Sequence, residues 1–382
     1  MTRPTMLSRR DVMAGAGALG AALLLAGCGG SGDDIDSEDL GGAVDLSVLN
    51  WPLYIDPDED GVEGTITRIQ RERGLRVTYD DSYEDNIAAW NDLIVPTLGT
   101  GGRLPYDIIT PTYWLAGRMV DRSWAEQIPL EIVPNHVNID PAYLTLAWDR
   151  GARYHMPWQA GITGLAYDPA LTQRPITSIA DLFDPAFRGR VAIIGEMRET
   201  VPFGMLLNGD DPSRPTEATA SAGLALFEEA RASGQIAQLT FGEFAEGLRS
   251  GQLWLAMAWS GDSVILQADR PDIEFVVPDE GAVQWFDTMV IPRGAANVAA
   301  AGTWMDYVYD PANAARITAW VQYISPVIGV REELQRLGGD AAELARNPIL
   351  FPDDETKRRL FTWGGLPIEI ENQLDARFAA LF

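Results

Sequence analysis

The 382-residue sequence is short of three reactive residue types, and each shortage excludes a kind of site. Cys28 is the only cysteine, so no disulfide can form within the chain and no metal or nucleophile site can be built from several thiols. His136 and His155 are the only histidines and Lys357 the only lysine, so a catalytic base would have to be a carboxylate or an imidazole. A glycine-rich phosphate loop is also absent. We therefore expect neither a metal nor a cofactor.

Basic residues are scarce as well, with 29 Lys and Arg against 55 Asp and Glu and a net charge of −26. Residues 1–27 carry a net charge of +2, which leaves −28 for the rest of the chain. Such a composition argues against nucleic acid as a partner, because phosphate binding requires basic patches. A negative field concentrates small cations instead. The acidity on its own is equally typical of a very soluble protein or a salty habitat.

Residues 1–27 have the features of a signal peptide, which is not part of the fold. Twin arginines, typical of Tat export, precede an apolar run from Val12 to Gly27. That run leads into Leu-Ala-Gly-Cys28, which resembles a bacterial lipobox, where the cysteine is lipidated and becomes the mature N-terminus. An uncleaved N-terminal anchor is the alternative. Residues 28–44, rich in Gly, Asp and Ser, predict a flexible tether.

We therefore expect an exported protein, anchored by lipid at the outer face of the cytoplasmic membrane. If the cell has an outer membrane, this location is the periplasmic space.

Strands and helices alternate after the tether, which is typical of an α/β fold with a mostly parallel sheet. In the first half we expect strands at 46–51, 75–79 and 106–110, with helices at 66–73 and 86–98. After a connector at 155–161 we expect strands at 162–167, 190–194, 253–259 and 281–292, with helices at 178–183, 220–231, 243–249 and from about 198. The last third is expected to be helical. Ligands of such sheets bind beyond the carboxyl ends of the strands.

Aromatic and acidic side chains recur at such strand ends. In the expected strand 281–292, Trp285 and Asp287 are two apart and would share one face. Trp259 ends another strand, and Glu196 and Glu199 are three apart, hence on one helix face. Indole rings and carboxylates suit an elongated organic cation, since the rings attract charge and cover methylenes while the acids pair with it. Core packing of the tryptophans and helix-dipole stabilisation by the glutamates are the alternatives.

The order of these landmarks resembles that of the spermidine/putrescine-binding proteins of bacterial polyamine ABC transporters. The resemblance extends from about Leu46 to about Trp363. Its landmarks include Asn50-Trp51-x-x-Tyr54, Tyr106-Asp107, Pro157 with Gly161 and Gly164, Met197-Arg198-Glu199, Trp259-x-Gly261, Trp285-x-Asp287 and Tyr323-x-Ser325-Pro326. The resemblance implies a two-lobe type II periplasmic-binding-protein fold, in which each lobe is a mixed, mostly parallel sheet flanked by helices and the ligand cleft lies between the lobes.

The resemblance also implies how the chain is divided between the lobes. Lobe 1 would comprise residues 45–156 and a return segment at 287–325. Lobe 2 would comprise residues 157–286. Residues 326–382 would form the rest of lobe 2 and the C-terminal helices.

The family's cleft, carried over position by position, would be lined by nine residues. Lobe 1 would contribute Trp51, Tyr54 and Tyr113, lobe 2 Glu196, Glu199 and Trp259, and the crossings Trp285, Asp287 and Tyr323. In the family, the acid matching Asp287 binds one amine of the ligand, and the acids matching Glu196 and Glu199 bind amines farther along it. The aromatic rings pack against the methylenes.

Three departures from the family pattern favour a shorter diamine such as putrescine, or another cationic or zwitterionic metabolite. Leu53 stands where the spermidine binders have an acid, Glu196 is longer than the family's Asp, and Gly364 replaces an expected polar side chain.

The resemblance implies a monomeric, non-catalytic receptor that binds a polyamine, closes by hinge motion and docks on a membrane permease. The same fold could bind a different cationic or zwitterionic solute. A secreted carboxylate-dependent glycoside hydrolase is a further alternative, because exposed tryptophans and acid pairs also suit sugars. Turnover discriminates between these classes, since a receptor releases its ligand unchanged.

Overall fold

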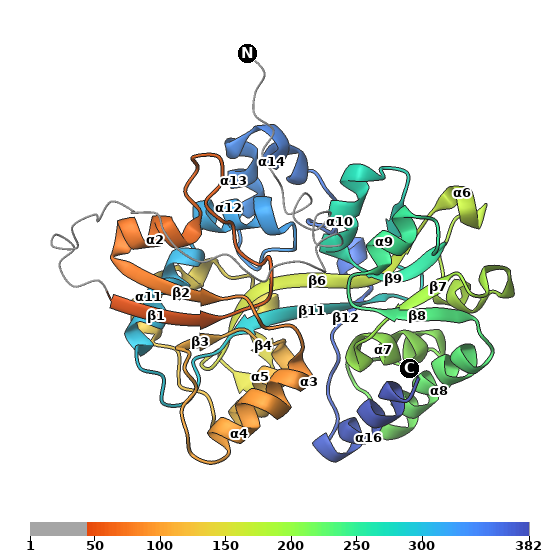
Figure 1. The fold of residues 1–382 in the computed structure, drawn as a ribbon, viewed down its shortest axis with the longest axis horizontal. Helices are drawn as coiled ribbons and strands as arrows, with labels where there is room; N and C mark the ends of the chain where they lie inside the picture. Colours follow the sequence, from red (N-terminus) through yellow and green to blue (C-terminus); the bar gives the residue numbers. More distant parts are fainter. Residues whose placement is uncertain (1–43, 382) are drawn as a thin grey trace, which may run out of the picture.

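The computed structural model describes residues 44–381, which form two α/β lobes lying side by side (Figure 1). The expected signal peptide, Cys28 and nearly all of the expected tether lie outside these described residues. Within residues 44–381, no helix has both the length and the apolar character that crossing a membrane requires.

The first lobe is built on a parallel sheet with strand order β2-β1-β3. Its strands are β1 (Val44–Leu49), β2 (Leu75–Asp80) and β3 (Ile108–Ile109). Helix α2 (Thr65–Arg73) connects β1 to β2 and ends at Gly74, whose left-handed conformation (φ 64°) lets its N–H bond to the carbonyl of Gln70. Further helices of this lobe are α3 (Asn86–Ala88), η1 (Ala89–Ile94), α4 (Val95–Leu98), α5 (Tyr113–Asp121), α11 (Val298–Val308) and α12 (Pro311–Val321).

The second lobe contains a mixed sheet with the order β12-β11-β6-β9-β7-β8, and β10 pairs with β6. Its strands are β6 (Met156–Tyr167), β7 (Val191–Ile194), β8 (Ile236–Thr240), β9 (Leu255–Trp259), β10 (Glu274–Val276), β11 (Ala282–Met289) and β12 (Leu360–Phe361). Its helices include α6 (Pro169–Thr172), η5 (Ile179–Phe183), α7 (Met197–Leu207), α8 (Glu217–Ala232), α9 (Phe244–Arg249), α10 (Ser260–Asp269) and α16 (Ile368–Ala379). The side chain of Ser178 caps η5 by accepting the backbone N–H of Ala180.

Two long antiparallel strands, β6 and β11, run from one lobe into the other (Figure 1). All twelve residues of β6 are buried. The segment 155–161, expected as a connector, is instead largely the first part of this strand, because its apolar side chains pack on both faces. Asp287 pairs with Gln159, and the register shifts between Asp287 and Thr288, so the ladder is irregular where the chain passes between the lobes.

The end of the chain contacts both lobes. Helix α13 (Val330–Leu337) packs on α14 (Gly339–Leu344) and on α12, which in turn contacts α2 of the first lobe. Only the later part, including β12 and α16, packs on the second lobe. The apolar face of α13, with Val330 and Leu334 buried, indicates a helix that must be covered but not which lobe covers it.

The departure noted at Gly364 has a packing reason. This residue donates its N–H to the carbonyl of Pro212, and a Cβ atom there would collide with the backbone of Ser213. Gly364 is therefore a close-approach glycine between the C-terminal segment and the chain before α8, and it does not line the cavity described below.

We predict that Gly364→Ala destabilises the ligand-free protein by about 1–3 kcal/mol, because the added methyl group forces the two backbones apart. The measurement is the free energy of unfolding in urea. Gly242→Ala is the matched control, since a Cβ atom at Gly242 meets nothing within 4 Å. Equal stabilities of the two variants would contradict the packing role.

Candidate ligand-binding cavity

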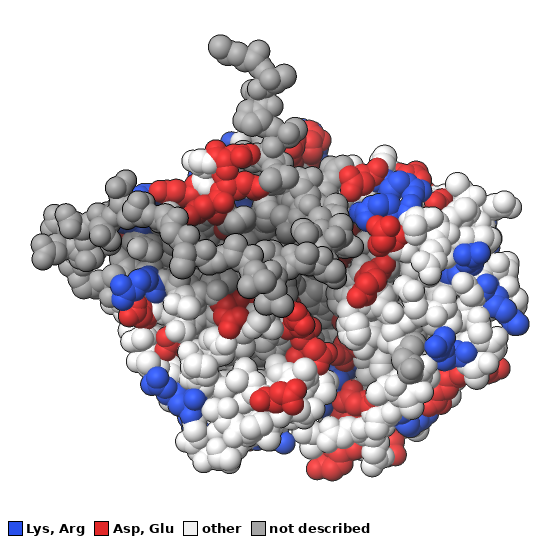
Figure 2. Space-filling view, in the orientation of Figure 1, with Lys and Arg blue, Asp and Glu red and all other residues white. Residues whose placement is uncertain are grey.

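One cavity of about 310 Å³ lies between the lobes, and all nine residues expected to line the cleft lie in its wall. They are Trp51, Tyr54, Tyr113, Glu196, Glu199, Trp259, Trp285, Asp287 and Tyr323. Acidic side chains also gather on the outer surface along the boundary between the two halves (Figure 2).

The aromatic wall of the cavity is fixed by ring contacts and by glycines behind the rings. The ring of Trp285 lies 6.3 Å from that of Trp259 and 5.5 Å from that of Tyr323, between centroids. A Cβ atom at Gly161 would collide with Trp285, and one at Gly261 with Tyr323. The glycines of the sequence landmarks therefore leave room for the rings to lie flat against the backbone of β6 and α10.

Asp287 is only 3% exposed and lies where β11 crosses between the lobes. The hydroxyls of Tyr54 and Thr112, both from the first lobe, donate to its two carboxylate oxygens at 3.0 and 2.7 Å. Burial raises the pKa of Asp287 to about 7, although both hydrogen bonds oppose the shift. Among the described residues, no arginine, lysine or histidine forms an ion pair with this carboxylate. Asp287 is thus a buried acid that lacks a cation.

Glu199, held partly buried in the first turn of α7, is a second acid that forms no ion pair with a basic residue among residues 44–381. Its Oε2 atom accepts the indole N–H of Trp259 at 2.8 Å and the hydroxyl of Thr163. Thr163 in turn accepts the indole N–H of Trp285 at 3.0 Å. Burial raises the pKa of Glu199 to about 8, and the nearby negative charges of Glu196 and Asp287 act in the same direction.

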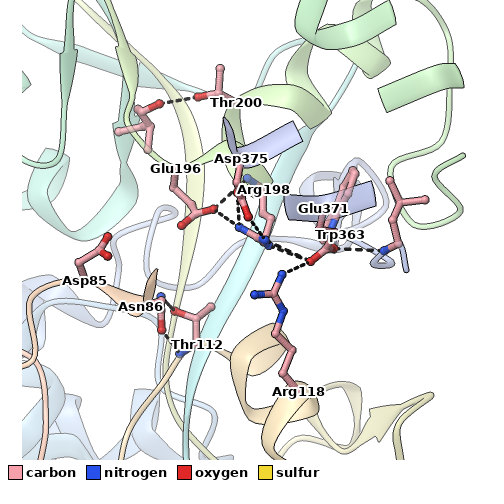
Figure 3. A network of polar contacts seen from close by, with 12 residues as sticks. Asp85, Asn86, Thr112, Arg118, Glu196, Arg198, Thr200, Trp363, Glu371 and Asp375 are labelled. Carbon is pink, nitrogen blue, oxygen red and sulfur yellow. Dashed lines mark hydrogen bonds and ion pairs between the residues drawn. The ribbon is translucent and has the colours of Figure 1, made fainter. Parts of the chain in front are cut away.

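Glu196 differs from these two acids because a basic residue neutralises it. It caps α7 by accepting the backbone N–H of Arg198, and its carboxylate also contacts the Arg198 guanidinium at 3.0 Å. Arg198 bonds at the same time to Asp375 and Glu371 of α16 (Figure 3). Burial raises the pKa of Glu196 while Arg198 opposes this shift. Glu196 thus stabilises the N-terminus of α7, as the helix-dipole alternative expects, in addition to lining the cavity.

Trp51 and Tyr113 contribute rings to the cavity while their polar atoms bond to backbone. The indole N–H of Trp51 donates to the carbonyl of Thr110 at 2.8 Å, and the hydroxyl of Tyr113 donates to the carbonyl of Trp363 at 3.0 Å. Leu53 also lies in the wall, in a left-handed conformation (φ 57°), and it brings no charge to this part of the cavity.

Sequence reasoning missed several residues of the wall. Among them are Glu84, Asp85, Thr112, Trp114, Arg198 and Asp262. The landmark Met197-Arg198-Glu199 contained Arg198, but its position depends on α16, more than 160 residues later in the chain. The described lining thus holds six carboxylates and one arginine, a strongly acidic wall. No group of three or more potential metal ligands gathers among residues 44–381.

Comparisons with known proteins agree with this architecture. The sequence profile of a family described as bacterial extracellular solute-binding protein matches residues 79–352. The spermidine/putrescine-binding periplasmic protein of Escherichia coli (strain K12) is 27% identical over 316 residues, which cover 81% of this chain and 84% of that protein. The putrescine-binding periplasmic protein SpuD of Pseudomonas aeruginosa (strain UCBPP-PA14) is 24% identical over 357 residues, covering 86% and 89%.

A solved structure shows the same fold. The spermidine/putrescine ABC transporter substrate-binding protein PotD of Streptococcus pneumoniae aligns with a TM-score of 0.73 at 21% identity, covering 88% of this chain and 98% of that chain. The expected two-lobe type II periplasmic-binding-protein fold is thereby confirmed.

The raised pKa values predict how stability depends on pH. Glu199 binds more protons in the folded than in the unfolded protein between its ordinary value of 4.5 and about 8, so the free energy of unfolding falls as pH rises through this window. We predict that Glu199→Gln, which keeps the acceptor oxygen, flattens this slope and stabilises the ligand-free protein at pH 8 by about 1–3 kcal/mol.

Urea unfolding at pH 5 and pH 8 measures the effect. Glu246→Gln on α9 is the control, because the Glu246 side chain is 68% exposed. If the slope of the Glu199→Gln variant matched that of the parent protein, Glu199 would not carry the shifted proton.

Proposed function

The chain belongs to the family of bacterial extracellular solute-binding proteins, and we propose that it is the receptor of an ABC importer that binds a polyamine, putrescine or spermidine. In this role it delivers the polyamine to a membrane permease. The relatives whose names specify these ligands align over most of their own length.

The observation that carries this proposal is a pair of carboxylates beside the aromatic wall, the buried Asp287 and the partly buried Glu199, neither of which forms an ion pair with a basic residue among residues 44–381. Burying an acid is costly unless a cation pairs with it. A bound ammonium group would supply the missing charge, while the rings of Trp259, Trp285 and Tyr323 would cover the methylenes. An anion or a neutral sugar leaves these carboxylates uncompensated.

Arg198 does not favour a zwitterionic ligand, although it lies in the wall. All three of its guanidinium nitrogens donate to carboxylates, those of Glu196, Glu371 and Asp375. Of the three acids carried over from the family, Arg198 neutralises Glu196, and Leu53 adds no fourth, so Asp287 and Glu199 are the two that we assign to ammonium groups. This count supports a diamine of putrescine length over a longer polyamine.

The receptor is non-catalytic in this proposal and acts as a monomer whose lobes close around the solute. Hinge motion occurs where the chain passes between the lobes, near residues 155–158, 287–288 and 323–326. The irregular register of β11 at Asp287 and the bridge between Ala160 and Ile324 lie at these crossings and support this choice. Each of the nine candidate residues contacts the solute.

We predict that the chain from Gly29 onward binds putrescine with a calorimetric signal, and that Asp287→Asn weakens binding by about 10- to 100-fold, the value of one charge-assisted hydrogen bond. Glu84→Gln is the control. It removes one charge from the lining, but Glu84 is exposed and water screens it, so its affinity should change less than about threefold.

Two results would contradict the polyamine assignment. One is heat with a neutral or anionic solute and none with di- and polyamines. The other is a chemically altered solute after incubation, which would indicate an enzyme.

The N-terminal sequence supports lipid anchoring after Tat-type export, with cleavage before Cys28. We predict that Cys28→Ala in the full chain abolishes metabolic labelling with a radioactive fatty acid and shifts the protein from the membrane fraction to the soluble fraction. Ser31→Ala, in the same tether, should retain both label and membrane association. Label that persists in the Cys28→Ala protein would rule out Cys28 as the acceptor.

A further inference from the structure

Helix α5 of the first lobe makes buried polar contacts with the C-terminal segment of the second lobe. Arg118 of α5 pairs with Glu371 of α16 at 2.7 Å, and the two side chains are 9% and 6% exposed. One turn earlier, the hydroxyl of Tyr113 donates to the carbonyl of Trp363. Helix α5 belongs to the core of the first lobe, whereas α16 packs on α7 and α8. These bonds therefore span the two lobes.

An aromatic ring strengthens the same junction. The guanidinium carbon of Arg198, from the second lobe, lies 3.8 Å from the ring centre of Trp114, and that of Arg118 lies 4.9 Å from it. Cations over an indole ring are attracted by its electrons, most strongly where water is excluded. Figure 3 shows Arg118 of the first lobe pointing to Glu371 of the second. Separating the lobes would remove Arg118 from Glu371 and Trp114 from Arg198 in one motion.

We propose that Trp114, Arg118, Arg198 and Glu371 form a clasp that holds the two lobes closed. Within the second lobe, Arg198 faces three carboxylates, those of Glu196, Glu371 and Asp375, which leaves an excess of two negative charges. Closure brings Arg118 into this buried cluster and halves the excess. Burial and the neighbouring charge of Arg198 lower the pKa of Arg118 and so oppose this attraction. The proposal is that the contacts with Glu371 and Trp114 together outweigh that cost.

The protonation of Glu371 agrees with this role. Burial by itself would raise the pKa of Glu371, but Arg198, the indole N–H of Trp363 and Arg118 outweigh burial and lower it. Both guanidinium groups therefore stabilise the charged form of Glu371 in the closed protein. With Arg118 removed, closure would bury a carboxylate with less compensation, which is costly.

The clasp is also coupled to the cavity, because Trp114 and Arg198 line it. The solute and the clasp stabilise the same closed arrangement, so each increases the effect of the other. Existence of the clasp rests on the two-lobe fold alone. Its coupling to a diamine rests on the proposed function.

The test measures the distance between the lobes directly. The chain from Gly29 onward contains every described element and no cysteine, so Asp92→Cys in η1 and Ala225→Cys in α8 give one exposed label site in each lobe. Pulsed spin-label spectroscopy of the ligand-free protein should show a short-distance population. Arg118→Met should shift that population to longer distances.

Arg122→Met is the matched control. Arg122 caps the end of the same helix, and its guanidinium lies against Trp90, Trp124 and the Arg118 carbonyl, all in the first lobe. It should leave the distances as in the parent. Glu371→Gln should shift them as Arg118→Met does, and the double variant should add little. Equal distance distributions in the parent and Arg118→Met proteins, with melting curves that show both to be folded, would overturn the clasp.

Titration with putrescine tests the coupling separately. Arg118→Met should weaken binding by about 5- to 100-fold, mostly through faster dissociation, while Arg122→Met leaves the affinity unchanged. If the parent protein bound no diamine, the proposed function would fail, yet the distance measurement would still decide the clasp. Unchanged dissociation in Arg118→Met would show that the clasp does not act on the solute.

Discussion

The structure depends most on the buried carboxylate of Asp287, at the point where β11 leaves one lobe for the other. Two first-lobe hydroxyls, of Tyr54 and Thr112, donate to it. Neutral donors cannot balance a full charge, and burial accordingly raises its pKa to about 7. A cation next to this carboxylate would stabilise its anionic form and lower its pKa. The fold thus creates a demand for positive charge between the lobes.

The acids of the cavity are divided between two tasks. Arg198 neutralises Glu196 and bonds to two carboxylates of α16, so this part of the wall joins α7 to the C-terminal helix. Glu199 is hydrogen-bonded only by neutral groups, the indole of Trp259 and the hydroxyl of Thr163. Six carboxylates line the cavity, and Asp287 and Glu199, which lie beside the aromatic wall, are the two that we propose set the charge of the solute.

Much of the architecture and the lining of the cavity could be predicted from the sequence. Alternation of apolar residues located most strands, and the two-residue period of β11 placed Trp285 and Asp287 on the same wall. Glycines such as Gly161 and Gly261 belonged to the landmarks because the rings lie on them. These features are local, since they depend on residues close together in the chain or on the order of strands.

Features that depend on distant packing could not be predicted in this way. The partners of Arg198 lie on α16, and no local pattern links the two segments. The apolar face of α13 does not specify which lobe covers it. Segment 155–161 contains proline and glycine, which favoured a connector, yet β11 pairs with it and makes it a strand. The sequence comparison led us to expect a polar, ligand-contacting residue at position 364. Glycine is needed there because the backbone of Ser213 leaves no room for a Cβ atom.

The cavity and the junction outside it share Trp114 and Arg198, and this sharing gives closure a physical basis. A solute that neutralises Asp287 and Glu199 removes the cost of burying them, and the same motion places Arg118 against Glu371. Neither contribution needs to be large, because the two act on one equilibrium between open and closed lobes. A junction that was too strong would close the empty protein and exclude the solute. The cost of burying Arg118 beside Arg198, which lowers the pKa of Arg118, limits how firmly the empty lobes can hold together.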